Sequence, residues 1–131
     1  MNSSGLILIE KYDIFLHYIY PVLQDIPKSH GIIKARAIEL VFLQPELIYR
    51  AIKSDHKSRL NEADAGLASI RHQLRFLSST RNIVNTLDKE SGKPIRKIGK
   101  PLLSKKAEQV SGIHLSEVGK IIGSMLNHRG K

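Results

Sequence analysis

The sequence contains no cysteine, and this absence excludes disulfide bonds, thiolate nucleophiles and zinc–thiolate sites together. A reducing compartment is consistent with a chain that carries no thiol. No HExxH, P-loop or GxGxxG sequence occurs, and no two of the six histidines stand at metal-binding helical spacing with a carboxylate in place. We therefore expect a non-enzymatic protein without a metal site or a bound cofactor.

Long apolar runs are also missing. Glu10, Lys11 and Asp13 interrupt the first apolar segment, so no stretch reaches the roughly 18 apolar residues that a membrane span needs. The first residues lack the charged start, the long apolar middle and the cleavage site of a signal peptide. We expect a cytoplasmic protein that does not bind membranes.

Acidic residues are the minority among the charged ones. The chain has 12 Asp and Glu against 21 Lys and Arg, which gives it a formal net charge of +9. The resulting positive potential attracts polyanions, so nucleic acid is the first partner class to consider and anionic lipid the second. Net charge alone gives no sequence specificity.

The sequence is rich in helical periodicity. Apolar residues recur at steps of three and four in four segments, at about residues 6–26, 29–53, 58–79 and 104–127. The expected seam of the first segment is Leu8, Tyr12, Phe15, Ile19, Val22 and Ile26. The clearest stripe is that of the third, which consists of Leu60, Ala63, Leu67, Ile70, Leu74 and Leu77. Over residues 1–131 this pattern predicts a single all-α domain, an up-and-down four-helix bundle.

The second segment is apolar almost all round, which is more apolar surface than one bundle can cover. Either it is the central helix of the fold, or its second face is a subunit interface. Pro45 predicts a bend that begins near residues 41–42, because proline removes a backbone donor. Beyond this segment, Asp55 or Ser58 is expected to cap the third helix.

Three glycines, Gly112, Gly119 and Gly123, interrupt the fourth segment, which Ser104 is expected to cap. Each glycine weakens a helix by about 1 kcal/mol relative to alanine. We therefore expect them where another helix backbone approaches closely, at Gly119 and Gly123 above all.

Between the third and fourth segments the periodicity disappears, so residues 82–103 are predicted to form a long loop. Loops of this length inside a compact domain tend to be functional or mobile. This one is strongly basic and is predicted to attract phosphate, although a loop that serves only solubility is the alternative. Its basic residues, with those that follow it, are Lys89, Lys93, Arg96, Lys97, Lys100, Lys105 and Lys106.

On the third segment, Arg71, His72 and Arg75 form a second candidate partner-binding surface. Arg71 and Arg75 are four residues apart, and no acid stands four residues before either one. A helix that repels itself in this way is expected to offer its charge to a partner. A solvated basic face is the competing interpretation.

One weak enzymatic pattern is present. Arg50 and His56 match the loose R-x(4–6)-H spacing of metal-independent helical ribonucleases of the HEPN type. This spacing arises often by chance in a basic chain with six histidines. A helical ribonuclease is nevertheless the alternative from another functional class.

Three segments carry a resemblance to a known family: YIYPVLQDIPKSHG (Tyr18 to Gly31), ADAGLASIRHQLRFL (Ala63 to Leu77) and SEVGKIIGSML (Ser116 to Leu126). They resemble the accessory variability determinant proteins of diversity-generating retroelements. More broadly, the chain is similar to the four-helix bundle proteins encoded in bacterial ribosomal RNA intervening sequences. A bundle protein of that kind with no known role is the third alternative.

The resemblance implies both an assembly and partners. It implies a homopentameric barrel with a basic surface. It further implies that this barrel binds the element's reverse transcriptase and RNA, or the complementary DNA, as a required non-catalytic partner in mutagenic retrohoming. Arg71 and Arg75 match basic residues of that family's third helix.

Overall fold

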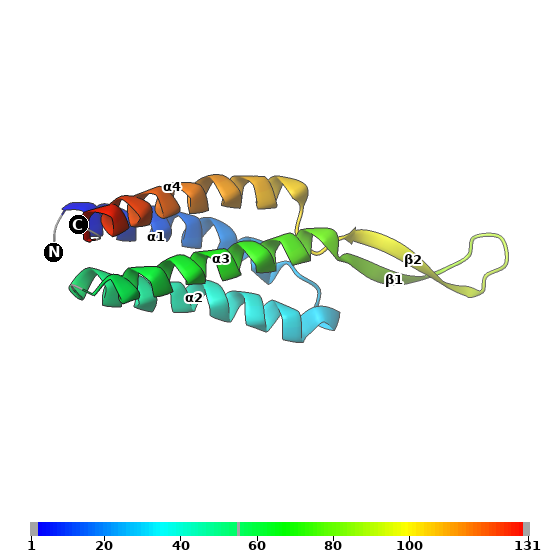
Figure 1. The fold of residues 1–131 in the computed structure, drawn as a ribbon. Coiled ribbons are helices and arrows are strands. Elements are labelled where there is room, and N and C mark those ends of the chain that lie inside the picture. Colours follow the sequence, from blue (N-terminus) through cyan, green and yellow to red (C-terminus); the bar gives the residue numbers. More distant parts are fainter. Residues whose placement is uncertain (1–2, 55, 130–131) are drawn as a thin grey trace.

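The computed structural model describes residues 3–54 and 56–129 (Figure 1). Within these residues there are four long helices: α1 (Ser3–Gln24), α2 (Gly31–Lys53), α3 (Lys57–Ser79) and α4 (Lys105–Arg129). A short 3-10 helix, η1 (Lys28–His30), precedes α2. Two strands, β1 (Arg81–Leu87) and β2 (Pro94–Pro101), connect α3 to α4.

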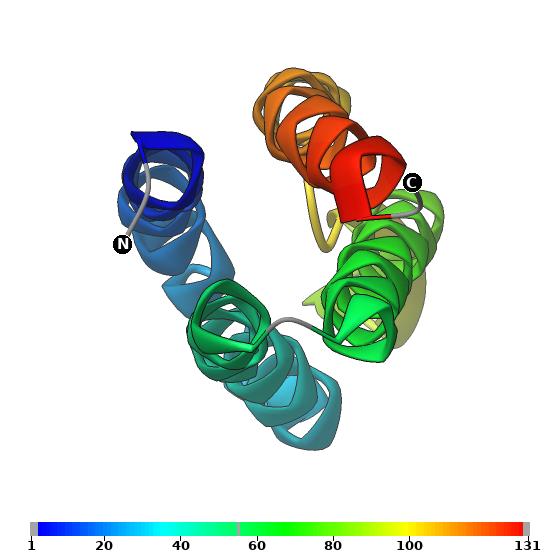
Figure 2. The ribbon, with the colours of Figure 1, turned by 60° about the vertical axis from the view of Figure 1, so that its left-hand side comes forward.

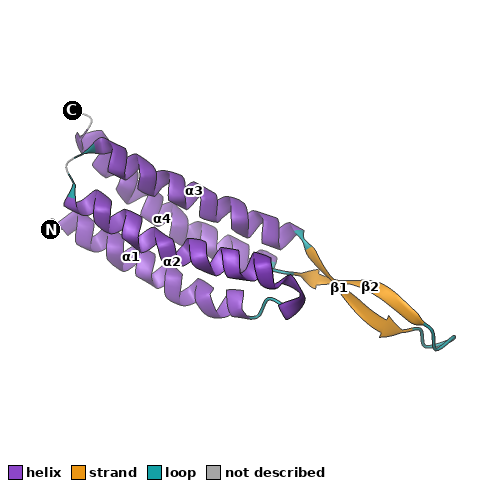
Figure 3. Ribbon diagram, turned by 90° about the horizontal axis from the view of Figure 1, so that it is seen from below, coloured by secondary structure: helices purple, strands orange, loops and turns teal. Residues whose placement is uncertain are grey.

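The helices form a bundle in which α1 packs against α2 and α4, and α3 packs against α2 and α4. Viewed towards the end that holds the two termini, the four helices follow one another around the bundle in chain order (Figure 2). The strands leave the opposite end of the bundle and extend away from it (Figures 1 and 3). The predicted helical bundle is therefore confirmed.

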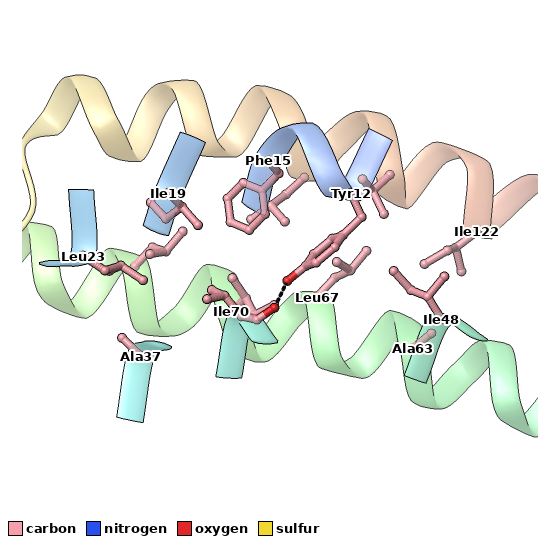
Figure 4. Close-up of a cluster of buried hydrophobic side chains, with 14 of the residues drawn as sticks. Tyr12, Phe15, Ile19, Leu23, Ala37, Ile48, Ala63, Leu67, Ile70 and Ile122 are labelled. Atoms are coloured by element: carbon pink, nitrogen blue, oxygen red, sulfur yellow. Dashed lines mark hydrogen bonds between the residues drawn. The ribbon is translucent and has the colours of Figure 1, made fainter. Parts of the chain in front are cut away.

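Buried aliphatic and aromatic side chains fill the centre of the bundle (Figure 4). All six residues of the predicted α3 stripe are buried, as is the α1 seam except at one place. There Leu23, and not Val22, is fully buried, while Ile26 is buried as expected. In α4, Ser111 and Leu115 are both buried.

The α2 helix continues through Pro45 from Gly31 to Lys53. Its buried stripe is Ala37, Val41, Gln44, Ile48 and Ala51, which consists of four apolar residues and one buried amide. Because α2 is flanked by α1 and α3, it is not a central helix. Its outer face exposes Ile32, Phe42, Leu43 and Tyr49.

The loop predicted at residues 82–103 is wrong in most of its length, because β1 and β2 form an antiparallel hairpin. A turn with Gly92 at φ 70° joins the strands. Beyond β2, the buried Leu102 and Leu103 fasten the hairpin to the bundle. Their amides donate to the carbonyls of Thr80 and Leu77, at N–O distances of 2.8 and 3.2 Å.

The helix caps agree with the sequence at α4 only. Ser104 caps α4, since its Oγ accepts from the amide of Ala107 at 3.0 Å. Ser58 lies inside α3, after His56 at the N-cap, so it is not the cap. Asp55 lies outside the described residues.

The glycines of α4 are not where helices approach. Apart from the neighbouring backbone of α4, no atom of the described residues would lie within 4 Å of a β-carbon at Gly112 or Gly123, and at Gly119 the neighbour is a side-chain atom, Arg71 Nη2. The close approach is at Gly66 of α3, beside the Gln44 side chain of α2. No helix among the described residues is long and apolar enough to cross a membrane.

Candidate partner-binding surface

Arg71 and Arg75 line a groove between α3 and α4 with a volume of about 210 Å³. Both side chains belong to exposed residues in the half of α3 nearest the hairpin. The apolar stripe of α3 fixes their direction, because it must face the core. His72, also exposed, does not line this groove. The other lining residues are Leu74, Glu108, Gln109, Gly112 and Leu115.

The two arginines differ in how they are held. Arg71 donates from Nη2 to the carbonyl of Leu115 at 3.0 Å, so it ties α3 to α4. Gly119 leaves room for this guanidinium, since a β-carbon there would lie 3.2 Å from Nη2. Among the described residues, Arg75 makes no ion pair within 4 Å. Arg75 can therefore offer its planar fork to a phosphate or a carboxylate.

The carboxylate that lines this groove, Glu108, is already engaged. It accepts a short hydrogen bond from the hydroxyl of Ser78, and its other oxygen lies 3.8 Å from Lys105 Nζ. Glu108 thereby holds α4 against the end of α3 and neutralises part of one lysine. The groove still presents two guanidinium groups and one carboxylate, which favours an anionic ligand.

The remaining predicted residues lie on and beside the hairpin. Lys89 is in the turn, Lys93 directly precedes β2, and Arg96, Lys97 and Lys100 are exposed on β2. Lys105 and Lys106 begin α4, where the helix dipole adds positive potential. Because α3 leads into β1 and β2 leads into α4, the structure brings these lysines and the arginine groove to the same half of the molecule (Figure 1).

Some features of this surface were not found from the sequence. Arg81, at the base of β1, donates from Nη1 to the carbonyl of Gly99 at 3.0 Å and so braces the hairpin. His30 Nε2 of η1 lies 3.0 Å from Asn82 Oδ1, and this contact connects the hairpin to the bundle. The strand signal was the group of β-branched residues Ile83, Val84 and Thr86, followed by a Ser-Gly pair at a turn.

A family model described as bAvd-like matches residues 6–104, which include three of the helices and the hairpin. The chain belongs to the bAvd-like family. This confirms the resemblance to the accessory variability determinant proteins, and membership indicates an accessory role in a diversity-generating retroelement. No curated protein matches the chain.

In this member of the bAvd-like family, the two residues of the ribonuclease alternative also share a surface. Arg50 and His56 line a shallow hollow of about 520 Å³ at the α2–α3 connection, at the end opposite the hairpin. Lys53 and Arg59 add positive charge there. The Arg50 guanidinium is bound to Glu46 at 2.7 Å, which leaves it less available to a phosphate.

Proposed function

We propose that the chain is a non-catalytic accessory protein that binds both the reverse transcriptase and the nucleic acid of its retroelement to support mutagenic retrohoming. The nucleic acid is the element's RNA or the complementary DNA. The observation that carries the proposal is the concentration of basic side chains at one end of a bAvd-like bundle. Arg75, the hairpin lysines and the first turn of α4 contribute to it.

The RNA contact would be electrostatic and largely independent of sequence. Lysine and arginine that neutralise phosphates release counterions, so affinity falls as salt rises. If about five phosphates of a single strand are neutralised, the slope of log K against log salt is roughly −3.5, from about −0.7 per phosphate. Anisotropy titrations of a labelled single-stranded RNA over a salt series measure this slope. A flat salt dependence would contradict the proposal.

Binding to the reverse transcriptase is tested separately. The purified enzyme and the accessory protein are mixed after nuclease treatment, so that RNA cannot bridge them, and analysed by size-exclusion chromatography. Co-elution is the expected result. Two proteins that elute apart both with and without RNA would contradict this part of the proposal.

We further propose a homo-oligomer, a pentamer as the family resemblance implies. The exposed apolar residues of α1 and α2 support it: Tyr20 and Phe42 stack edge to face at 5.3 Å, and Leu43 and Tyr49 are also half exposed. Such a patch on a soluble chain favours a protein contact. Light scattering should give a mass near five chains of 14.7 kDa. A monomer at micromolar concentration would contradict it.

The shared hollow of Arg50 and His56 makes the ribonuclease the second candidate. If it holds, the purified protein cuts RNA in the presence of a metal chelator, and His56→Ala abolishes the cutting. Intact RNA after incubation with the parent protein rejects this candidate. The same result does not contradict the proposed accessory function.

A further inference from the structure

The hairpin is a two-stranded sheet, and no other element of the described residues covers it beyond its base (Figures 1 and 3). Isolated two-stranded hairpins are marginally stable in water and gain stability from a third strand or a packed layer. This one exposes unusual apolar surface, since the exposed fractions are 57% for Ile83, 63% for Leu87 and 75% for Ile98. All three side chains belong to the same face of the ribbon, given the pairing of Ile83 with Ile98.

The strand register shows which backbone groups point away from the hairpin. The amide of Asp88 donates to the carbonyl of Lys93 at 2.9 Å, so these facing residues form a hydrogen-bonded pair. Pairs alternate along an antiparallel ladder, so Leu87 with Pro94, and Asn85 with Arg96, are non-hydrogen-bonded pairs. The N–H and C=O groups of such pairs point outwards. The outer edge of β1 is therefore made by Ile83, Asn85 and Leu87.

The outer edges of β1 and β2 are protected to different extents against pairing with another strand. Natural edge strands avoid pairing through proline, charged side chains and bulges. On β2 all three are present, namely Pro94 and Pro101, a basic run, and a bulge where Gly99 and Lys100 face Asn82. Between Asn82 and Leu87, β1 has no proline, no charge and no extra residue. The edge of β1 is thus free to accept another strand.

Charge and side-chain type indicate the occupant. Residues 81–101 carry six Lys and Arg side chains but only two carboxylates. One of these, Asp88, already accepts a hydrogen bond from Ser91 Oγ at 2.8 Å. The hairpin has no aromatic side chain on which a base could stack, and its exposed apolar residues are aliphatic. An extended protein segment with acidic side chains fits this surface better than nucleic acid does.

We propose that the outer edge of β1 binds an extended acidic segment of the reverse transcriptase as a third strand. The main-chain hydrogen bonds come from Ile83, Asn85 and Leu87. Acidic side chains of the added strand lie across β1 from Arg96 on one face of the sheet and from Lys97 on the other. This inference rests on the proposed function, because it assigns the enzyme-binding role to one edge of the hairpin. The RNA is left to the other lysines and to Arg75.

Hydrogen exchange on the parent protein tests the proposal without any substitution. On addition of the reverse transcriptase, the amides of Ile83, Asn85 and Leu87 should become protected at least tenfold, while those of Arg96 and Ile98 stay unchanged. If the enzyme co-elutes with the protein but the β1 amides exchange as before, the strand-addition proposal fails and the accessory function stands. Protection of β1 by single-stranded RNA alone would also overturn it. If the enzyme does not bind at all, both fail.

Matched proline variants isolate the backbone contact. Asn85→Pro removes an outward N–H from the β1 edge, whereas Asn85→Ala keeps it. We expect Asn85→Pro to bind the enzyme at least tenfold more weakly than Asn85→Ala. On the opposite edge, Arg96→Pro and Arg96→Ala remove the same charge and should bind equally. Equal binding by the two Asn85 variants would reject the proposal. Protected amides at Val84 and Thr86 would show that the hairpin is still formed in each variant.

Discussion

The hydroxyl of Tyr12 in α1 donates a hydrogen bond to the backbone carbonyl of Val41 in α2 (Figure 4). Val41 stands four residues before Pro45, whose ring nitrogen has no hydrogen to give that carbonyl. Tyr12 is 2% exposed, and burial raises the pKa of its hydroxyl above the ordinary value, so it stays protonated. A side chain from one helix thus completes the hydrogen bonding of its neighbour.

Replacing Tyr12 with phenylalanine should therefore cost stability. The Val41 carbonyl would be left buried with no donor, which costs about 1–3 kcal/mol in such cases. Denaturant unfolding followed by circular dichroism measures the loss. A midpoint equal to that of the parent would contradict the assigned role.

Pro45→Ala supplies the control. In this background residue 45 has an N–H that can bond the Val41 carbonyl within α2, so Tyr12→Phe should cost clearly less than in the parent. The double-mutant cycle then gives the coupling between the two positions. Simple additivity would mean that the hydroxyl and the proline act independently.

Gly66 should be intolerant of alanine even though it lies inside a helix. A β-carbon there would lie 2.0 Å from Gln44 Oε1, and the Gln44 amide is held in place because Nε2 donates to the Ala63 carbonyl at 2.7 Å. Gly66→Ala must therefore displace a buried amide, and we expect destabilisation of roughly 1–3 kcal/mol from overpacking. Thermal unfolding measures it.

The matched control substitutions should change the stability in the opposite direction. In Gly112→Ala and Gly123→Ala the new β-carbon meets no atom of the described residues within 4 Å beyond the neighbouring backbone of α4, so each variant should gain up to about 1 kcal/mol of stability from helix propensity. If Gly66→Ala is stabilised like these two, the Gln44 contact does not restrict the site.

The helices were predictable because burial imposes a period on the sequence. The α3 stripe shows this best, since its six apolar positions are all buried. The hairpin sequence shows no such period, because neither face of the hairpin packs against the core. Ile83 and Val84 are exposed on its opposite faces. Gln44 and Ser111 occupy core positions although they are polar, and Ser111 Oγ has no hydrogen-bond partner among the described residues. Periodicity of apolar residues cannot find either one.

Asp88 should make the hairpin turn sensitive to acid. Hydrogen bonds from Ser91 Oγ and from the amide of Glu90 hold the pKa of the Asp88 carboxyl below its ordinary value of 3.8. A lowered folded-state pKa means that the contribution to stability is present above 3.8 and is lost as the pH falls through the folded-state pKa. Amide shifts of Gly92 should report opening of the turn in acid. Asp88→Asn should remove this transition, and an unchanged transition would assign it to another group.

Substitutions of the two groove arginines should affect RNA binding and stability to different extents. Arg75 makes no ion pair among the described residues, so Arg75→Glu is expected to change stability by less than about 0.5 kcal/mol. It should still weaken RNA binding at least tenfold, because a phosphate contact becomes a repulsion. Arg71→Glu also removes the bond to the Leu115 carbonyl, so it should lose about 1 kcal/mol of stability in addition.

Arg59→Glu is the control for net charge, because it makes the same change on the same helix at the end away from the hairpin. Its partner Glu62 lies 3.3 Å away and both side chains are about half exposed, so the lost pair matters little. RNA binding that falls equally in Arg59→Glu and Arg75→Glu would show that only overall charge counts. Arg75→Lys tests the planar guanidinium fork, because it keeps the charge and removes the fork. An RNA affinity between those of the parent and Arg75→Glu would indicate that Arg75 binds phosphate through two parallel hydrogen bonds.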